Sequence, residues 1–150
     1  MYLLDTNVVT GLRRRDRADP HLAAWAESVA PSDLYLSALS LLELEMGVLA
    51  LENRNPSLAA PLRQWLTAKV LPAFKDRILT VDAAVARRAA AFHVPHRRPE
   101  RSVLIAATAI VHGLIVVSRN PADFEPLGIV VINPWQPHNQ DLNANQGTEP

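Results

Sequence analysis

Short apolar runs alternate along the chain with longer stretches in which apolar residues recur every three or four positions. A short apolar run between turn-forming residues is typical of a buried strand, while the wider spacing indicates an amphipathic helix. We predict strands at residues 2–4, 34–36, 78–81, 114–117 and 129–132, and helices near residues 8–12, 19–29, 38–51, 57–74, 83–92 and 99–112. This alternation favours an α/β fold, in which helices cover both faces of a mainly parallel sheet.

The ends of several predicted helices carry residues that suit those positions. Asp19 stands before Pro20, and Asp82 stands before an alanine-rich stretch. An aspartate at this place accepts hydrogen bonds from the free N–H groups of the first turn, and proline fits the first helical position. Gly113 follows the last predicted helix, where glycine readily adopts the left-handed conformation that ends a helix. We expect Pro72 to end or bend the helix at 57–74.

The composition is that of a folded protein with one domain. The chain has 150 residues, of which 49% are hydrophobic and 20% are charged, and this excludes a disordered or fibrous protein. Residues 136–150 are rich in Asn and Gln, so we expect a domain over residues 1–135 and a disordered tail over 136–150. The 15 basic and 15 acidic residues cancel, so any attraction to nucleic acid must come from a local patch.

Two further absences narrow the class of protein. The chain has no cysteine, which excludes disulfide and thiolate chemistry. The apolar start of the chain is interrupted at Asp5, and no basic region precedes it, as a secretion signal would require. The longest apolar stretches, at 103–111 and 114–117, fall short of the ~20 residues of a membrane span. We therefore expect a cytoplasmic protein with no membrane partner.

Three acidic residues stand where apolar elements meet loops or helices. Asp5 ends the first predicted strand, Asp123 follows the strand at 114–117, and Glu43 lies on an otherwise apolar helix. The carboxyl ends of parallel strands point to the same edge of a sheet, so Asp5 and Asp123 can meet there, and a flanking helix can add Glu43. Carboxylates gathered in this way repel one another unless a cation neutralises them, and Mg²⁺ prefers such oxygen ligands.

Each of these acids also has a purely structural interpretation. An aspartate before a helix is usually a cap, an aspartate after a strand usually belongs to a turn, and a glutamate on a helix is usually solvated. Taken singly, either aspartate signal is structural about four times in five. Periodicity and chemistry alone therefore support an α/β domain that is compatible with an acidic metal site, and no more.

Four segments, in this order, resemble the motifs of PIN domains. They are residues 1–9 (MYLLDTNVV), residues 36–47 (LSALSLLELEMG), residues 104–109 (LIAATA) followed by His112 and Gly113, and residues 116–124 (VVSRNPADF). The resemblance covers roughly residues 1–135. Four motifs in the right order are far more specific than any one of them. Within the family, the chain is most similar to the VapC/FitB toxins of bacterial toxin–antitoxin pairs.

The resemblance implies a fold, an activity and partners. The fold is a three-layer α/β/α domain with a central, mainly parallel sheet of about five strands. The activity is that of an endoribonuclease dependent on Mg²⁺ or Mn²⁺, with Asp5, Glu43 and Asp123 as catalytic residues and metal ligands. Thr6 and Asn120 are the implied supporting polar groups. The implied partners are an RNA substrate and a cognate antitoxin, in a homodimer or a toxin–antitoxin hetero-oligomer.

One acidic position of the family pattern is not acidic in this chain. The third motif normally begins with an aspartate, and Ser102 stands at that place; Gly11 likewise stands where many relatives have glutamate. Glu100 lies about 200° around the helix from Ser102, so it should point away from the site. We therefore expect an attenuated ribonuclease. The alternative is a catalytically inactive PIN domain that binds an antitoxin or RNA. An unrelated α/β phosphohydrolase is disfavoured, because no glycine-rich phosphate loop is present.

Basic residues and leucines indicate two contact surfaces. We predict that Arg13 in one cationic cluster, and Arg97, Arg98 and Arg101 in another, contact RNA or an antitoxin. The leucine-rich helices at 38–51 and 57–74 should bury one another and leave a groove for an antitoxin segment. An antitoxin arginine should then reach the acidic pocket, because a cation there relieves the repulsion between carboxylates.

Overall fold

A five-stranded parallel sheet forms the centre of the computed structural model, which describes residues 1–137. Its strands are β1 (Tyr2–Leu4), β2 (Leu34–Ser37), β3 (Ile78–Leu79), β4 (Ile115–Val117) and β5 (Val131–Ile132). They lie in the order β3-β2-β1-β4-β5, and every neighbouring pair is parallel. Strands β2 and β3 lie on one side of β1, and β4 and β5, which come later in the chain, lie on its other side. The carboxyl ends of β1 and β4 are therefore adjacent at the point where the strand order reverses.

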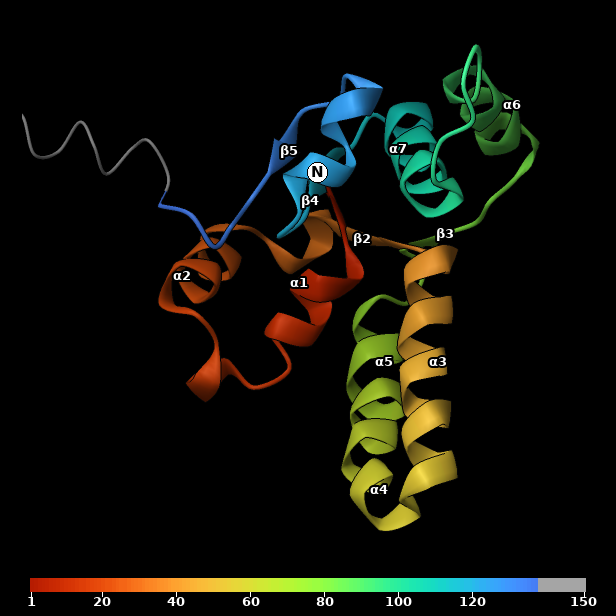
Figure 1. The fold of residues 1–150 in the computed structure, drawn as a ribbon. Helices are drawn as coiled ribbons and strands as arrows, with labels where there is room; N and C mark the ends of the chain where they lie inside the picture. The colour runs from red at the N-terminus through yellow and green to blue at the C-terminus, as the bar shows by residue number, and fades with distance from the viewer. Residues whose placement is uncertain (138–150) are drawn as a thin grey trace, which may run out of the picture.

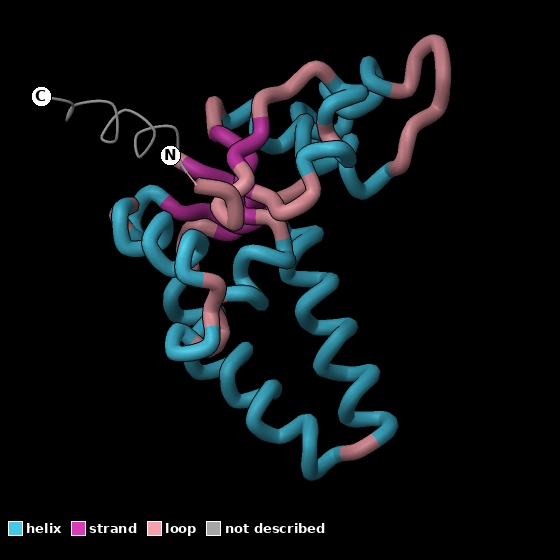
Figure 2. Tube along the Cα trace, turned by 60° about the vertical axis from the view of Figure 1, so that its left-hand side comes forward, coloured by secondary structure: helices cyan, strands magenta, loops and turns pink. Residues whose placement is uncertain are grey.

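Helices cover both faces of this sheet (Figure 2). They are α1 (Thr6–Gly11), α2 (Pro20–Ser28), α3 (Ala38–Arg54), α4 (Pro56–Trp65), α5 (Leu71–Ala73), α6 (Ala83–Phe92) and α7 (Glu100–His112), with short 3-10 turns at η1 (Arg15–Arg17), η2 (Pro31–Asp33), η4 (Pro121–Asp123) and η5 (Glu125–Leu127). The predicted three-layer α/β/α architecture is confirmed. No helix in residues 1–137 combines the length and the apolar character that crossing a membrane requires.

Two separate cores lie on the two faces of the sheet. Side chains alternate between the faces along each strand. Leu4 and Val117 therefore pack into the core beneath α1 to α4, while Leu3 and Val116 pack beneath α7. Figure 1 shows the same division, with α6 and α7 on one side and α1, α2 and the long α3–α5 hairpin on the other.

Most predicted helix boundaries are confirmed by the observed caps. The Asp19 carboxylate accepts hydrogen bonds from the N–H groups of His21 and Leu22, and the Asp82 carboxylate accepts one from Val85. Gly113 ends α7 with φ +66°, the left-handed conformation that glycine adopts without a steric penalty.

The helix predicted at 57–74 is divided into three parts. α4 ends at Trp65, a π-helical segment labelled η3 runs over Leu66–Val70, and α5 completes the hairpin. Pro72 lies in α5 and has no N–H to offer the preceding turn, so the regular hydrogen-bond ladder cannot run through it. Pro72 thus marks the end of the helical region, as expected, but the widened turn before it was not foreseen.

A cluster of three charged side chains joins α3 to α4. Arg63 donates hydrogen bonds of 2.7 Å to both Glu45 and Glu52. Its hydrogen bond lowers the pKa of Glu52, against a smaller opposing effect of burial, and the attraction of its charge adds to the lowering. The pKa of Arg63 is raised by the same contacts. These ion pairs hold the two arms of the hairpin together at its exposed surface.

Candidate functional site

Asp5 lies at the carboxyl edge of the sheet, directly after β1. Its backbone N–H continues the ladder to Val117 at 2.8 Å, and its side chain is only 1% exposed. Oδ1 accepts a hydrogen bond of 2.8 Å from the N–H of Thr6, because Asp5 also caps α1. The aspartate is thus both a helix cap and a buried carboxylate, which requires a compensating partner.

Ser118 orients this carboxylate from the neighbouring strand. It follows β4 directly and is fully buried, and its hydroxyl donates a 2.7 Å hydrogen bond to Asp5 Oδ2. The Ser118 hydroxyl oxygen itself accepts hydrogen bonds from the Asn7 side chain at 3.4 Å and from the N–H of Asn120 at 3.1 Å. A hydroxyl has one donor and two acceptor sites, so Ser118 is fully satisfied and its rotamer is fixed.

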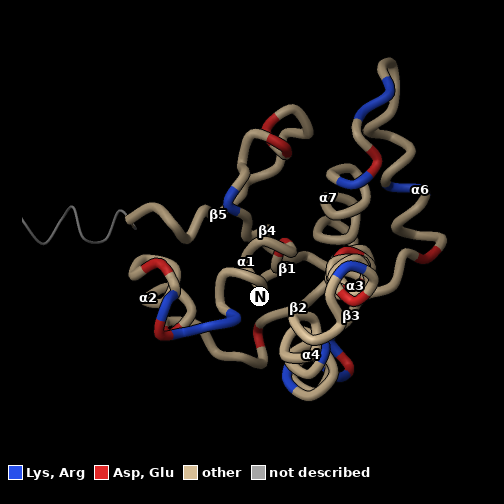
Figure 3. Tube along the Cα trace, turned by 60° about the horizontal axis from the view of Figure 1, so that its bottom comes forward, with Lys and Arg blue, Asp and Glu red and all other residues tan. Residues whose placement is uncertain are grey.

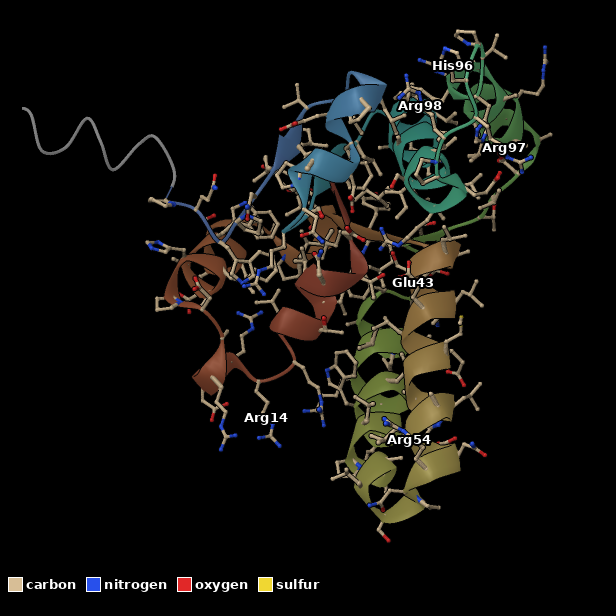
Figure 4. All side chains as sticks on the ribbon, viewed as in Figure 1. Arg14, Glu43, Arg54, His96, Arg97 and Arg98 are labelled. Atoms are coloured by element: carbon tan, nitrogen blue, oxygen red, sulfur yellow. The ribbon has the colours of Figure 1, made fainter. Side chains whose placement is uncertain are left out.

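Glu43 approaches Asp5 through a shared arginine. Arg101, in the first turn of α7, donates from Nε to Glu43 Oε1 at 2.7 Å and from Nη2 to Asp5 Oδ1 at 2.5 Å. Glu43 is about one-third exposed and lies near the end of α3 that adjoins the sheet (Figure 4). One guanidinium therefore bridges two carboxylates carried by different elements.

The electrostatics of this cluster favour a cation. Burial acts to lower the pKa of Arg101, but the hydrogen bonds and charges of Asp5 and Glu43 outweigh it, and the net shift of the pKa is upward. Arg101 therefore stays charged. Two carboxylates face one guanidinium, so the local charge is about −1 and the site retains an attraction for positive groups.

Asp123 does not join this pair of acids. It is exposed on η4, and the following Phe124 is fully buried in the core beneath α7 and anchors the turn. Within residues 1–137, no three acidic, histidine or cysteine side chains lie close enough together to hold a metal ion. The structure thus brings two of the three predicted acids together and leaves the third apart.

The two residues considered for the missing acid lie as the helical periodicity predicts. Ser102 is buried on α7, with 6% of its surface exposed. Glu100 is exposed and pairs with Arg97 at 3.4 Å, so it does not turn toward Asp5. Glu100 therefore does not replace the aspartate that the family pattern has at the position of Ser102.

The predicted supporting residues act through their backbone. Thr6 and Asn120 contribute N–H groups, to Asp5 and to Ser118 respectively. The Thr6 hydroxyl is buried and makes no hydrogen bond within the described residues. Sequence reasoning missed Ser118 and Asn7 as the orienting side chains. The only available signal was their position beside Asp5 and Asn120 in the motifs.

The predicted contact arginines have different surroundings. The Arg101 guanidinium binds Asp5 and Glu43 within the chain, and its predicted contact with RNA or an antitoxin stays a prediction. The Arg13 guanidinium lies 5.8 Å from the centre of the Trp65 ring, and Arg98 donates to the carbonyl of Phe92.

The predicted basic clusters form two separate patches. Figure 4 shows Arg14 on one side of the molecule and Arg97 and Arg98 on the other, and Figure 3 shows the basic stretch between α1 and α2.

The two donors are of the chemical type that a divalent ion prefers. Asp5 Oδ1 and Glu43 Oε1 are hard carboxylate oxygens that already converge on one cation, the Arg101 guanidinium. Mg²⁺ and Mn²⁺ prefer such oxygens and need only one or two carboxylates if water completes the coordination. Such an ion would have to replace the guanidinium, because both would use the same oxygens.

The PIN domain family matches the chain over residues 2–127, and the chain belongs to this family. Among curated proteins, the VapC ribonuclease Y4jK of Sinorhizobium fredii is 33% identical over 142 residues, which cover 91% of this chain and 99% of the relative. The toxin FitB of Neisseria gonorrhoeae is 34% identical over 140 residues, which cover 90% and 99%. The resemblance to the VapC/FitB type is thereby confirmed.

Solved structures agree with this assignment. The crystal structure of FitAcB from Neisseria gonorrhoeae matches with a TM-score of 0.82 at 34% identity, over 91% of this chain and all of that chain. A toxin–antitoxin complex from Klebsiella pneumoniae matches with a TM-score of 0.65 at 22% identity, over 91% of this chain and all of that chain, which supports the fold alone.

Proposed function

We propose that this protein is the toxin of a toxin–antitoxin pair, a cytoplasmic endoribonuclease that depends on Mg²⁺ or Mn²⁺ and is attenuated by Ser102. The observation that carries the proposal is the convergence of Asp5 and Glu43 on one cation at the edge of the sheet. Relatives that match nearly their whole length are named a VapC ribonuclease and a FitB toxin, which supports the same activity here.

Each acid has a distinct task in the proposed reaction. When bound, the divalent ion would activate a water molecule and stabilise charge on the scissile phosphate. Asp5 would be a rigid ligand, because Thr6 and Ser118 hold its carboxylate in one orientation. Glu43 would supply the second carboxylate from α3. Asp123, exposed on η4, is kept as the third proposed ligand on the motif resemblance alone.

Ser102 would weaken the site through its lack of charge. A hydroxyl offers a neutral oxygen, whereas the aspartate expected at this position would add a negative charge. Changes even outside the direct ligands typically cost about 10–100-fold in metal affinity or activity, and loss of a carboxylate ligand should cost at least as much.

An apolar stripe on α3 supports a protein partner. Leu42, Met46 and Leu49 are 54%, 58% and 51% exposed, and their spacing places them on one face of the helix. Exposed apolar patches commonly mark protein interfaces. We propose a cognate antitoxin and a homodimer or hetero-oligomer as partners, in line with the FitAcB structure. A pull-down with the product of an adjacent small gene tests the antitoxin, and failure to bind would count against the toxin assignment.

A catalytically inactive binding module is the second candidate. The occupation of Asp5 and Glu43 by Arg101 favours it, because a chain that neutralises its own acids can fold without metal. In this alternative the protein binds an antitoxin or RNA and does not cleave.

Cleavage of RNA by the purified protein, with and without Mn²⁺, separates the two candidates. We expect slow metal-dependent cleavage by the parent protein, cleavage at least about tenfold faster by Ser102→Asp, and none by Asp5→Asn. No cleavage by the parent or by Ser102→Asp at saturating Mn²⁺ would establish the inactive module.

A further inference from the structure

Arg101 is one residue away from the position of the missing acid. It extends from the first turn of α7 and reaches both Asp5, after β1, and Glu43, on α3. Three elements distant in sequence are therefore joined at one guanidinium. By contrast, the nearby Arg97 is 85% exposed and pairs with Glu100, three residues further along the chain.

We propose that Arg101 is a built-in competitor for the cation site: its guanidinium and a divalent ion occupy the Asp5–Glu43 pair in turn. The inference rests on the proposed function only in taking this pair as the place where the ion binds. It adds a metal-free state in which the Arg101 side chain occupies the site.

Mutual exclusion follows from the shared atoms. The guanidinium uses Asp5 Oδ1 and Glu43 Oε1, which are the oxygens that converge on the site. A divalent ion at these oxygens would repel the guanidinium strongly at such short range in a partly buried place. Ser118 and Thr6 would keep Asp5 in position in either state, because their hydrogen bonds do not involve Arg101.

The geometry also allows the exchange. The Arg101 side chain is 36% exposed, so it has access to solvent and can leave without unfolding α7. Asp5 is 1% exposed, so its charge needs a cationic partner in the metal-free protein, and Arg101 supplies it. The ion must therefore displace an existing pair, which lowers its apparent affinity.

The direct test is the affinity of the full chain for Mn²⁺, measured by calorimetry. We expect Arg101→Ala to bind Mn²⁺ at least about tenfold more tightly than the parent, because the competitor is gone. Arg101→Lys, which retains the charge without the forked geometry, should bind with intermediate affinity. Arg54→Ala is the matched control: it removes one positive charge from the same helix as Glu43, farther along α3 (Figure 4), and should bind as the parent does.

A second measurement uses the parent protein itself, in case Arg101→Ala fails to fold. The Nε–H proton of Arg101 is held by Glu43, so its nuclear magnetic resonance signal should be protected from exchange with water. Addition of Mg²⁺ should shift this signal and abolish its protection. A protected, unshifted signal at saturating Mg²⁺ would overturn the proposal, as would equal Mn²⁺ affinities for the parent, Arg101→Lys and Arg101→Ala.

The outcomes distinguish this proposal from the proposed function. Tighter Mn²⁺ binding by Arg101→Ala without RNA cleavage by any variant would support the competitor and reject the nuclease. Cleavage by the parent and Ser102→Asp, with Mn²⁺ affinity independent of residue 101, would support the nuclease and reject the competitor.

Discussion

Arg101 donates a 2.7 Å hydrogen bond from Nε to Glu43 Oε1, although the two residues are 58 positions apart in the sequence. The bond joins the first turn of α7 to α3 at the carboxyl edge of the sheet. Since the same guanidinium also binds Asp5, it is a structural link as well as a charge partner.

Loss of this link should destabilise the metal-free protein. Removing one partner of a fully buried ion pair costs about 3–5 kcal/mol. Because Arg101 and Glu43 are each about one-third exposed, we expect a smaller loss of about 2 kcal/mol for Arg101→Ala. Urea unfolding in a chelator measures it, and Arg54→Ala should stay within about 0.5 kcal/mol of the parent. Equal stability of Arg101→Ala and the parent would mean that the link is not present in solution.

Removing the Ser118 hydroxyl should leave Asp5 Oδ2 without its buried donor. We expect Ser118→Ala to lower the free energy of unfolding by about 1–3 kcal/mol, the usual cost of an unsatisfied buried group. Ser118→Thr keeps the hydroxyl and is the control, which should retain most of that stability. If both variants lose the same amount, packing rather than the hydrogen bond explains the effect.

Restoring the acid at position 102 should couple stability to metal. By the motif resemblance, Ser102→Asp adds a negative charge to the site of Asp5 and Glu43, so the metal-free variant should unfold at a lower temperature than the parent. A divalent ion removes this repulsion and binds only the folded state. The metal-dependent rise of the thermal midpoint should therefore be larger by several degrees, whereas the uncharged Ser102→Asn should behave as the parent. Equal rises for Ser102→Asp and the parent would place Ser102 outside the site.

The stability of the α3–α4 hairpin should depend on pH through Glu52. Its pKa in the folded protein is lowered below the ordinary value of 4.5, chiefly by the hydrogen bond from Arg63. A lowered carboxyl pKa stabilises the folded state above the unfolded pKa, and this contribution is lost as the pH falls through the folded pKa. Thermal midpoints measured from about pH 6 downward should therefore fall less steeply in Arg63→Met than in the parent. Parallel curves would show that the Arg63–Glu52 pair contributes nothing to stability in solution, which is the case for many exposed ion pairs.

Two glycines in helices should respond in opposite ways to alanine. A Cβ at Gly11 would lie 2.8 Å from Leu22 Cδ2 and 2.9 Å from Trp135 Cζ2, so Gly11→Ala should cost about 1–3 kcal/mol by overpacking. A Cβ at Gly47, inside α3, meets no atom within 4 Å, so Gly47→Ala should stabilise by up to about 1 kcal/mol. Chemical unfolding of the two variants measures both effects. Stabilisation by Gly11→Ala would mean that Trp135 moves aside freely.

The sequence alone determined the elements and the place of the first acid. Apolar periodicity and capping residues such as Asp19 and Asp82 specify where strands and helices begin, because these signals act over a few residues. A carboxylate directly after a short apolar run also specifies that Asp5 lies at the edge of the sheet. The π-helical turn at Leu66–Val70 was not predicted, because it departs from the regular spacing of apolar residues by which helices are recognised in a sequence.

Only the tertiary structure decided which charges meet. From the sequence, Arg101 belongs to a basic cluster that is predicted to contact RNA or an antitoxin, and Asp123 belongs with the other acids. In the folded chain, the packing of α7 against the sheet turns Arg101 toward Asp5 and Glu43, and the burial of Phe124 holds Asp123 outside on η4. The direction of a side chain depends on how its helix or turn is rotated against its neighbours. That rotation is set by long-range packing, which no local pattern in the sequence contains.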